Sequence, residues 1–154
     1  MSEMRCPRCG NIVPPMTDRC PACGTPLSNG VLPQLQFVDA VKMVFQKYAD
    51  FSGRSRRSEF WWFYLFGVIV GVVLNIITSI SGTLGYVLMG LYWVATIVPN
   101  LAVGVRRLHD IGKSGFNLFW GLLPIVGVIL LIVWWVKDSD PRPNEYGPSP
   151  KYVM

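Results

Sequence analysis

Charged and apolar residues divide the chain into a polar first part and two uncharged stretches. Residues 60–105 contain no charged side chain, and residues 115–136 form a second uncharged run after a short ionic interval. A helix needs about 20 apolar residues to cross the roughly 30 Å hydrocarbon core of a bilayer. We therefore predict three transmembrane helices, at about 60–80, 84–105 and 115–136.

Buried helices of a soluble protein are an alternative that the composition disfavours. Helices that are apolar on every side need a large polar shell around them, and only 15% of the 154 residues are charged. The pattern therefore predicts an all-α integral membrane protein, preceded by a small polar module.

The third apolar stretch has two helix-weakening residues near its centre. Pro124 removes a backbone hydrogen bond and favours a kink, and Gly127 follows it closely. The halves at 115–123 and 128–136 would each cover about half a bilayer. A re-entrant hairpin, which would return residues 137–154 to the side where the stretch began, is the alternative to a third full span.

Residues 37–50 have the spacing of an amphipathic helix. The apolar side chains recur at intervals of three and four residues, as on one helical face, and they belong to Phe37, Val41, Val44, Phe45 and Tyr48. The segment is too short and too charged to span. We expect an amphipathic interfacial helix in the headgroup region; packing on the cytosolic ends of the spanning helices is equally open.

Basic residues are unevenly distributed between the linkers. The formal net charge is +5, and the linker at 81–83 has no charge. Positive residues favour the cytoplasmic side, and the first 30 residues lack the apolar core of a secretory signal. We therefore expect a cytoplasmic N-terminus. The basic residues that flank the predicted spans are Arg54, Arg56 and Arg57, then Arg106, Arg107 and Lys113.

All four cysteines lie near the N-terminus, in two C-x-x-C pairs. They occur as "CPRCG" and "CPACG", and they are Cys6, Cys9, Cys20 and Cys23. Zinc prefers four tetrahedral ligands, and four thiolates form structural sites. Gly10 and Gly24, which follow the pairs, suit the positive φ of a tight turn. We predict a structural Zn²⁺ ribbon at residues 1–27 and a linker at 28–36.

Other uses of the cysteine module fit less well. Disulfides are rare in a reducing cytosol, and thioredoxin-like chemistry needs one C-x-x-C near a βαβ pattern. So small a module has no core of its own, so the metal should provide most of its folding free energy. No aromatic residue precedes Phe37, which disfavours nucleic acid and favours a cytosolic protein as partner.

Four motifs occur in an order that resembles a known family. "FSGRSRRSEFWWF", "RRLHDIGKSGF", "LLPIVGVILL" and "NEYGPSP" are similar to the signature of domain of unknown function 805, a family of small bacterial inner-membrane proteins. Asn117 departs from the bulky aromatic pair that commonly follows "SG". The resemblance implies a multi-pass domain at 51–150 in the bacterial inner membrane, followed by a short tail at 151–154. It implies no activity.

The ionic motifs are the main candidate site of the membrane domain. We expect them at the cytosolic surface, where they would bind anionic lipid headgroups or pair with one another across two loops. The candidates are Arg54, Arg56, Arg57, Glu59, Arg106, Arg107, His109, Asp110 and Lys113. An acid–base pair of His109 and Asp110 is disfavoured, because adjacent side chains rarely reach the same substrate and no nucleophile is evident.

Asn75 and Asn100 are candidate polar groups within the predicted spans. Asparagines in the membrane bond across helices or mark a pathway. No charged residue lies within a predicted span, and ion-coupled carriers usually need some.

The pattern as a whole favours a membrane-anchored interaction or regulatory module over an enzyme. In this hypothesis the zinc ribbon binds a cytosolic protein and the arginine loops bind anionic lipid. The first alternative is a small oligomeric transporter or channel, and the second is a lipid- or envelope-modifying enzyme. Homo-oligomerisation stays open.

Overall fold

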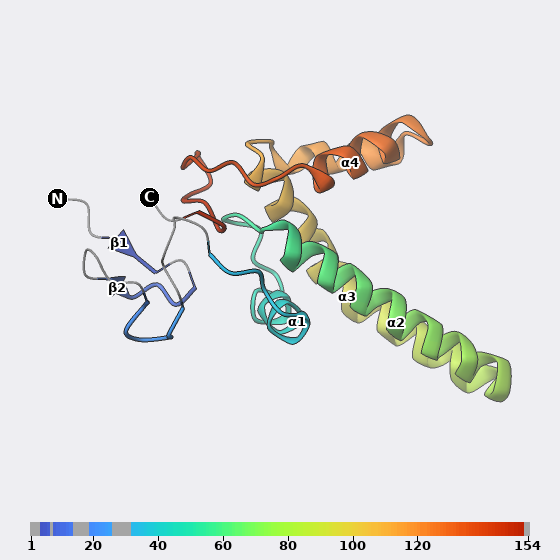
Figure 1. Ribbon diagram of the computed structural model, residues 1–154. Helices are drawn as coiled ribbons and strands as arrows, with labels where there is room; N and C mark the ends of the chain where they lie inside the picture. Colours follow the sequence, from blue (N-terminus) through green and yellow to red (C-terminus); the bar gives the residue numbers. More distant parts are fainter. Residues whose placement is uncertain (1–3, 7, 14–18, 26–31, 153–154) are drawn as a thin grey trace.

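Helices form most of the part of the chain that the structure describes. The computed structural model describes residues 4–6, 8–13, 19–25 and 32–152. Figure 1 shows the two-stranded cysteine module at one end and the helices extending away from it. The elements are β1 (Met4–Arg5), β2 (Ile12–Val13), α1 (Phe37–Gln46), α2 (Arg57–Ser81), α3 (Thr83–Asp110), the 3-10 helix η2 (Gly115–Leu122) and α4 (Val126–Val136).

Helices α2 and α3 form a long antiparallel hairpin (Figure 1). They have 25 and 28 residues, so each is about 37–42 Å long at 1.5 Å per residue and exceeds the roughly 30 Å bilayer core. Gly82 joins them with a φ of 48°. Gly85 lies so close to Thr78 that a Cβ would clash with its backbone. The first two predicted spans correspond to these two helices.

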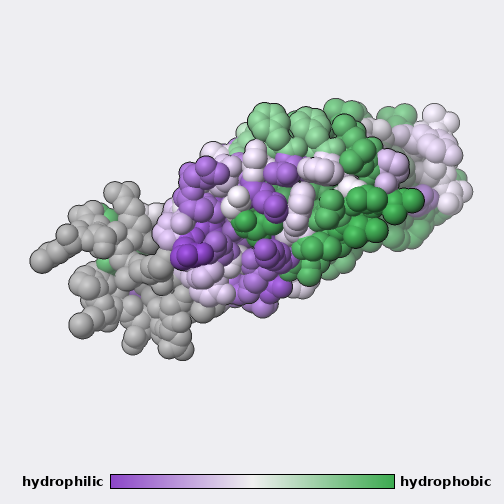
Figure 2. Space-filling view, turned by 90° about the horizontal axis from the view of Figure 1, so that it is seen from above, coloured by the Kyte–Doolittle hydropathy of each residue, from purple (hydrophilic) through white to green (hydrophobic). Residues whose placement is uncertain are grey.

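The surface is apolar over the helices and polar at the opposite end. Figure 2 shows hydrophobic residues gathered along the helical part and hydrophilic residues beside the cysteine module. Large side chains such as Ile80 on α2 and Val94 on α3 are 80% and 70% exposed. Such a surface is expected where lipid, rather than water, surrounds the helices.

The third predicted span does not form a single helix. Residues 115–136 form η2 and α4, which pack against each other after a reversal at 123–125. Ile125 takes a φ of 66°, and a Cβ on Gly127 would lie 1.7 Å from the carbonyl oxygen of Trp120. Helix α4 is about 16 Å long. Residues 115–136 thus form a short helical hairpin, as the alternative to a third full span expected, because Pro124 and Gly127 permit this reversal.

Helix α1 packs on the end of the α2–α3 hairpin. Its Ala40 and Val44 are fully buried, and Val44 shares a core with Phe60, Phe63 and Val103. Of the two placements that the sequence left equally open, the structure therefore shows packing on the ends of the long helices, which buries one face of α1. The helix ends at Gln46, and 47–49 form a turn, so the predicted end at residue 50 was too late.

The C-terminal segment, residues 137–152, returns to the polar end of the molecule. Asp140 donates its backbone N–H to the carbonyl of Asp110 at the end of α3, over 3.4 Å. The backbone N–H of Leu32 donates to the carbonyl of Lys151 over 2.7 Å. The segment thus lies between the membrane domain and the residues that follow the cysteine module (Figure 1).

Candidate metal centre and arginine network

Two matching turns form the cysteine module. In the first, Gly10 donates its N–H to the carbonyl of Cys6 over 2.7 Å; in the second, Gly24 donates to Cys20 over 2.8 Å. Both glycines have positive φ, 75° and 68°, as their position after each cysteine pair predicts. Each turn therefore points two sulfurs to one side.

The four cysteines come together in a cluster compatible with a metal site. Their sulfur atoms all lie within 4.8 Å of one another, and the Sγ–Sγ distances are 3.6 Å for Cys6–Cys23 and for Cys9–Cys20. A tetrahedral zinc with Zn–S bonds of about 2.3 Å separates its sulfurs by about 3.8 Å. The donor set therefore fits zinc in number, type and spacing.

Thr25 supports one ligand of this cluster. Its Oγ1 lies 2.9 Å from Cys23 Sγ, and the hydroxyl is buried. Donation of the hydroxyl hydrogen stabilises a thiolate and lowers the pKa of Cys23 to about 6. A thiolate is the form in which cysteine binds metal.

Among the described residues, one ion pair joins the cysteine module to the rest of the protein. Arg8 of the first turn lies 3.2 Å from Asp39 of α1. Both side chains are more than 40% exposed, so this contact contributes little free energy.

Asp110 lies between two arginines at the end of α3. Arg107 approaches its Oδ2 at 2.6 Å, and Arg54 approaches its Oδ1 at 3.0 Å. All three side chains are buried. Arg107 also donates to the carbonyls of Trp135 and Lys137 at the end of α4. The carboxylate thereby joins α3, α4 and the loop before α2.

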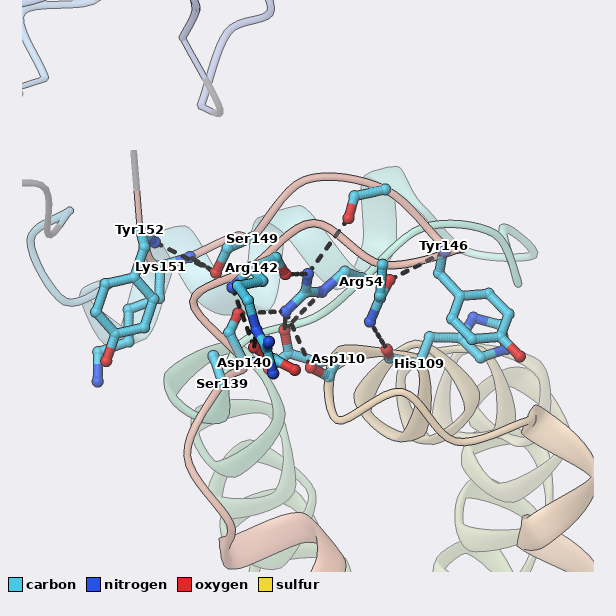
Figure 3. Close-up of polar contacts among 12 residues, drawn as sticks. Arg54, His109, Asp110, Ser139, Asp140, Arg142, Tyr146, Ser149, Lys151 and Tyr152 are labelled. Carbon is cyan, nitrogen blue, oxygen red and sulfur yellow. Dashed lines mark hydrogen bonds and ion pairs between the residues drawn. The ribbon is translucent and has the colours of Figure 1, made fainter. Parts of the chain in front are cut away.

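Arg54 fixes the C-terminal segment. Figure 3 shows its guanidinium surrounded by that segment and by Asp110. The Nη2 group donates to the carbonyl of Asp140 over 2.7 Å, and Nη1 donates to the carbonyls of Arg142 and Gly147 over 2.8 and 3.3 Å. All three carbonyls belong to the C-terminal segment, so these bonds form only because that segment returns to the polar end of the molecule.

A second buried pair joins α2 to α3. Arg106 Nη2 lies 3.2 Å from Glu59 Oε1, and both side chains are almost fully buried. Arg106 Nη1 donates to the carbonyls of Lys47 and Asp50, in the loop after α1. This arginine therefore joins three segments and does not face lipid headgroups.

His109 is part of the same packing. Its Nδ1 lies 3.1 Å from the carbonyl oxygen of Gly53 and donates to it. Its ring stacks on Tyr146, with centroids 3.7 Å apart and planes 1° apart (Figure 3). Its backbone carbonyl accepts from the Asn144 amide over 2.8 Å. Asp110 turns to the arginines, so the adjacent pair faces different neighbours.

The remaining basic candidates lie at the edges of this network. Arg56 is buried and donates to the carbonyl of Pro33 over 2.7 Å. Arg57 is exposed and lies 3.4 Å from Asp138. Lys113 lies over the ring of Trp134, 4.5 Å from its centroid.

The two asparagines bond within their own helices. Asn75 Nδ2 donates to the carbonyl of Gly71 over 2.9 Å, and Asn100 Nδ2 donates to that of Thr96 over 2.7 Å. Both residues are exposed on the helical surface. Among the described residues neither contacts another helix by a hydrogen bond.

The contribution of the C-terminal segment was missing from the predicted site. Its carbonyls, its stacked Tyr146 and its Asn144 complete the surroundings of Arg54 and His109. The sequence signal for this contribution was Pro124 and Gly127 in the third apolar stretch, because a reversal there would bring the C-terminal segment back to the arginines.

The comparisons place these features in a known sequence family. Residues 48–148 match the family model described as "Protein of unknown function (DUF805)". The chain is 42% identical over 110 residues to "Inner membrane protein YhaI" of Escherichia coli, which covers 71% of this chain and 92% of that protein. It is 33% identical over 112 residues to "Inner membrane protein YhaH", covering 70% and 93%. No solved structure matches.

Proposed function

The chain belongs to the DUF805 family of proteins of unknown function. We propose that it is a non-enzymatic membrane module that presents a zinc ribbon to a cytosolic protein. The observation that carries the proposal is the position of the cysteine cluster, which rests on the polar end of an apolar helical domain through Arg8 and Asp39. A metal-folded module held at a membrane surface suits binding better than catalysis.

The ionic residues support a binding role rather than a catalytic one, because their side chains bond to other parts of the protein. The carboxylates of Asp110 and Glu59 are buried against arginines, and His109 is stacked on Tyr146. A general base must lie within hydrogen-bond reach of the substrate proton that it accepts. These three groups face protein instead.

The membrane placement in this proposal has two crossings. Helices α2 and α3 cross the bilayer, while η2 and α4 enter it and return on the same side. The basic residues at the polar end support a cytosolic position for that end, and the bonds of Arg54 to the C-terminal segment require both to lie together. The N- and C-terminal parts then share the cytosolic face.

Lipid contact falls to the basic residues that are exposed or partly exposed. Arg57 and Lys113 lie at the surface near the helix ends, where anionic headgroups attract each cation by about 1 kcal/mol. Arg106 and Arg107 are fully buried. The proposal therefore assigns headgroup binding to the first pair and internal bonding to the second.

The ribbon offers an apolar contact on its outer surface. Ile12 is 54% exposed, and it shares a shallow surface with Asn11, Pro21 and Ala22. Its neighbour Val13 is buried against Cys6 and Cys20, so Ile12 faces outward and leaves apolar area available to a partner. A cytosolic protein with an apolar patch fits this surface.

Site-specific photocrosslinking in the native bacterium tests the proposal. A photoreactive residue at Ile12 should yield one defined protein adduct, and the adduct should disappear when Cys6→Ser and Cys20→Ser remove the metal site. The same residue at Ile80, on the apolar end, is the control and should yield no such adduct. Absence of a protein adduct from Ile12, or an adduct that survives loss of the cysteines, would contradict a folded ribbon as the binding surface.

A further inference from the structure

A cavity of about 390 Å³ lies where the cysteine module, α1, the loop before α2 and the C-terminal segment meet. Small-molecule sites typically occupy about 300–1,000 Å³. Arg8 and Thr25 line it from the module, Met43 and Lys47 from α1 and its end, and Tyr146 from the C-terminal segment. It lies beside the arginine network at the polar end.

The charges that line this cavity do not cancel. Four of the lining groups are paired: Arg8 and Asp39 with each other, Arg54 with Asp110, and Glu59 with Arg106. The two other lining cations are Lys47 and Arg56. Within the described part of the chain, neither has a carboxylate at ion-pair distance. With four basic and two acidic side chains, the cavity lining carries a net charge of +2.

Arg56 is held in place by backbone carbonyls and has no carboxylate within ion-pair distance among the described residues. Its residue is only 6% exposed, and its Nη1 and Nη2 donate to the carbonyls of Pro33 and Leu32 over 2.7 and 3.4 Å. Burial lowers its pKa from the ordinary value. A buried cation is costly unless an anion accompanies it, and the carbonyls supply dipoles only.

Apolar groups form much of the remaining wall. Leu32, Leu35, Met43, Pro148 and the ring of Tyr146 line the cavity. A ligand that matches both the basic and the apolar parts of the lining has a doubly charged anionic group joined to an apolar or aromatic group. A phosphate monoester carries about two negative charges at neutral pH, and arginine binds phosphate through paired N–H groups.

We propose that this cavity binds a phosphate monoester, with Arg56 and Lys47 as the groups that bind the phosphate. The ester comes either from a soluble metabolite or from the monoester headgroup of phosphatidic acid in the adjacent bilayer. This site is independent of the partner of the zinc ribbon.

The test uses the full-length, zinc-loaded protein in detergent and in nanodiscs. Calorimetric titration with phenyl phosphate measures the soluble source, and native mass spectrometry of nanodiscs with phosphatidic acid or phosphatidylcholine measures the lipid source. Lys47→Gln and Arg56→Gln should each raise the Kd of the binding probe about tenfold or more, since each removes a charge-assisted contact. Arg142→Gln is the matched control, because the Arg142 side chain is 83% exposed and lies outside the cavity lining.

Each outcome decides the proposal. Phenyl phosphate that binds wild type and is weakened by both substitutions supports a soluble ester, and retention of phosphatidic acid alone with the same dependence supports the headgroup. If neither probe binds wild type, or if Arg142→Gln weakens binding as much as the other two, the site is not there. Zinc content and melting temperature of each variant are measured first. If Arg56→Gln fails to fold, Lys47→Gln, on a partly exposed side chain, decides alone.

Discussion

The hydroxyl of Tyr48 donates to the carbonyl oxygen of Ala95 over 2.5 Å, and that carbonyl is the one that Pro99 leaves without a helical partner. Proline has no N–H, so the bond from residue 99 to residue 95 of α3 cannot form. In lipid an unsatisfied backbone carbonyl is costly. The turn after α1 supplies the missing donor, and this links α1 to the middle of α3.

Tyr48→Phe should therefore destabilise the protein by about 1–3 kcal/mol, the cost of leaving a backbone carbonyl unsatisfied where lipid, not water, surrounds the helix. Adding Pro99→Ala restores the backbone N–H, so Tyr48→Phe should cost less in that background. Melting in detergent of the two single variants and the double variant measures this coupling. Tyr86→Phe is the control, since Tyr86 is 71% exposed on the same helix; equal losses at both tyrosines would refute the role of the bond.

Asp110→Asn should cause a much larger loss. It leaves Arg54 and Arg107 buried without their carboxylate, and loss of one partner from a buried ion pair costs about 3–5 kcal/mol. The matched control is Asp138→Asn, whose ion pairs with Arg57 and Lys151 are partly exposed and contribute about 1 kcal/mol or less each. Chemical unfolding in detergent compares the two, and similar losses would contradict the central position of Asp110.

Gly127→Ala tests the close approach of η2 and α4. The added methyl would meet the Trp120 carbonyl, so the hairpin must open, at a cost of about 1–3 kcal/mol for overpacking. Gly90→Ala adds the same methyl to α3 in open space and should not lower the melting temperature. A Gly127 variant as stable as wild type would show that the hairpin is looser than the structure indicates.

Thr25→Val should weaken metal binding. The buried hydroxyl bonds to Cys23 Sγ, and loss of a hydrogen bond to a metal ligand typically lowers affinity about 10–100-fold. Competition with a chromogenic chelator measures the zinc affinity. Thr25→Ser keeps the hydroxyl and should behave like wild type; equal affinities for the valine and serine variants would remove Thr25 from the metal site.

The long apolar stretches and the cysteine spacing were sufficient to predict α2, α3 and the cysteine cluster. Helices surrounded by lipid require uninterrupted apolar sequence, and a tetrathiolate site needs a local spacing of cysteines. Both constraints act on neighbouring positions. They can therefore be read along the chain without knowledge of the tertiary contacts.

The burial of the arginines and the path of the C-terminal segment could not be predicted in this way. Basic residues beside a span ordinarily face water or headgroups, whereas Arg106 is buried by its bonds to Glu59 and the loop after α1. Pro124 and Gly127 indicated a break in the third stretch but not whether the chain would reverse there. The reversal depends on the close contact of Gly127 with Trp120, which is tertiary.

The side of the C-terminus tests the account most directly. Fusions of green fluorescent protein and of alkaline phosphatase after residue 154 report opposite sides of the inner membrane, and the same reporters inserted at Gly82 mark the far end of the α2–α3 hairpin. If both termini lie on the cytosolic face, the C-terminal fusion is fluorescent and phosphatase-negative, and the Gly82 fusion is phosphatase-positive. A phosphatase-positive C-terminus would mean that residues 115–136 cross the membrane, and the bonds of Arg54 to the C-terminal segment could not form.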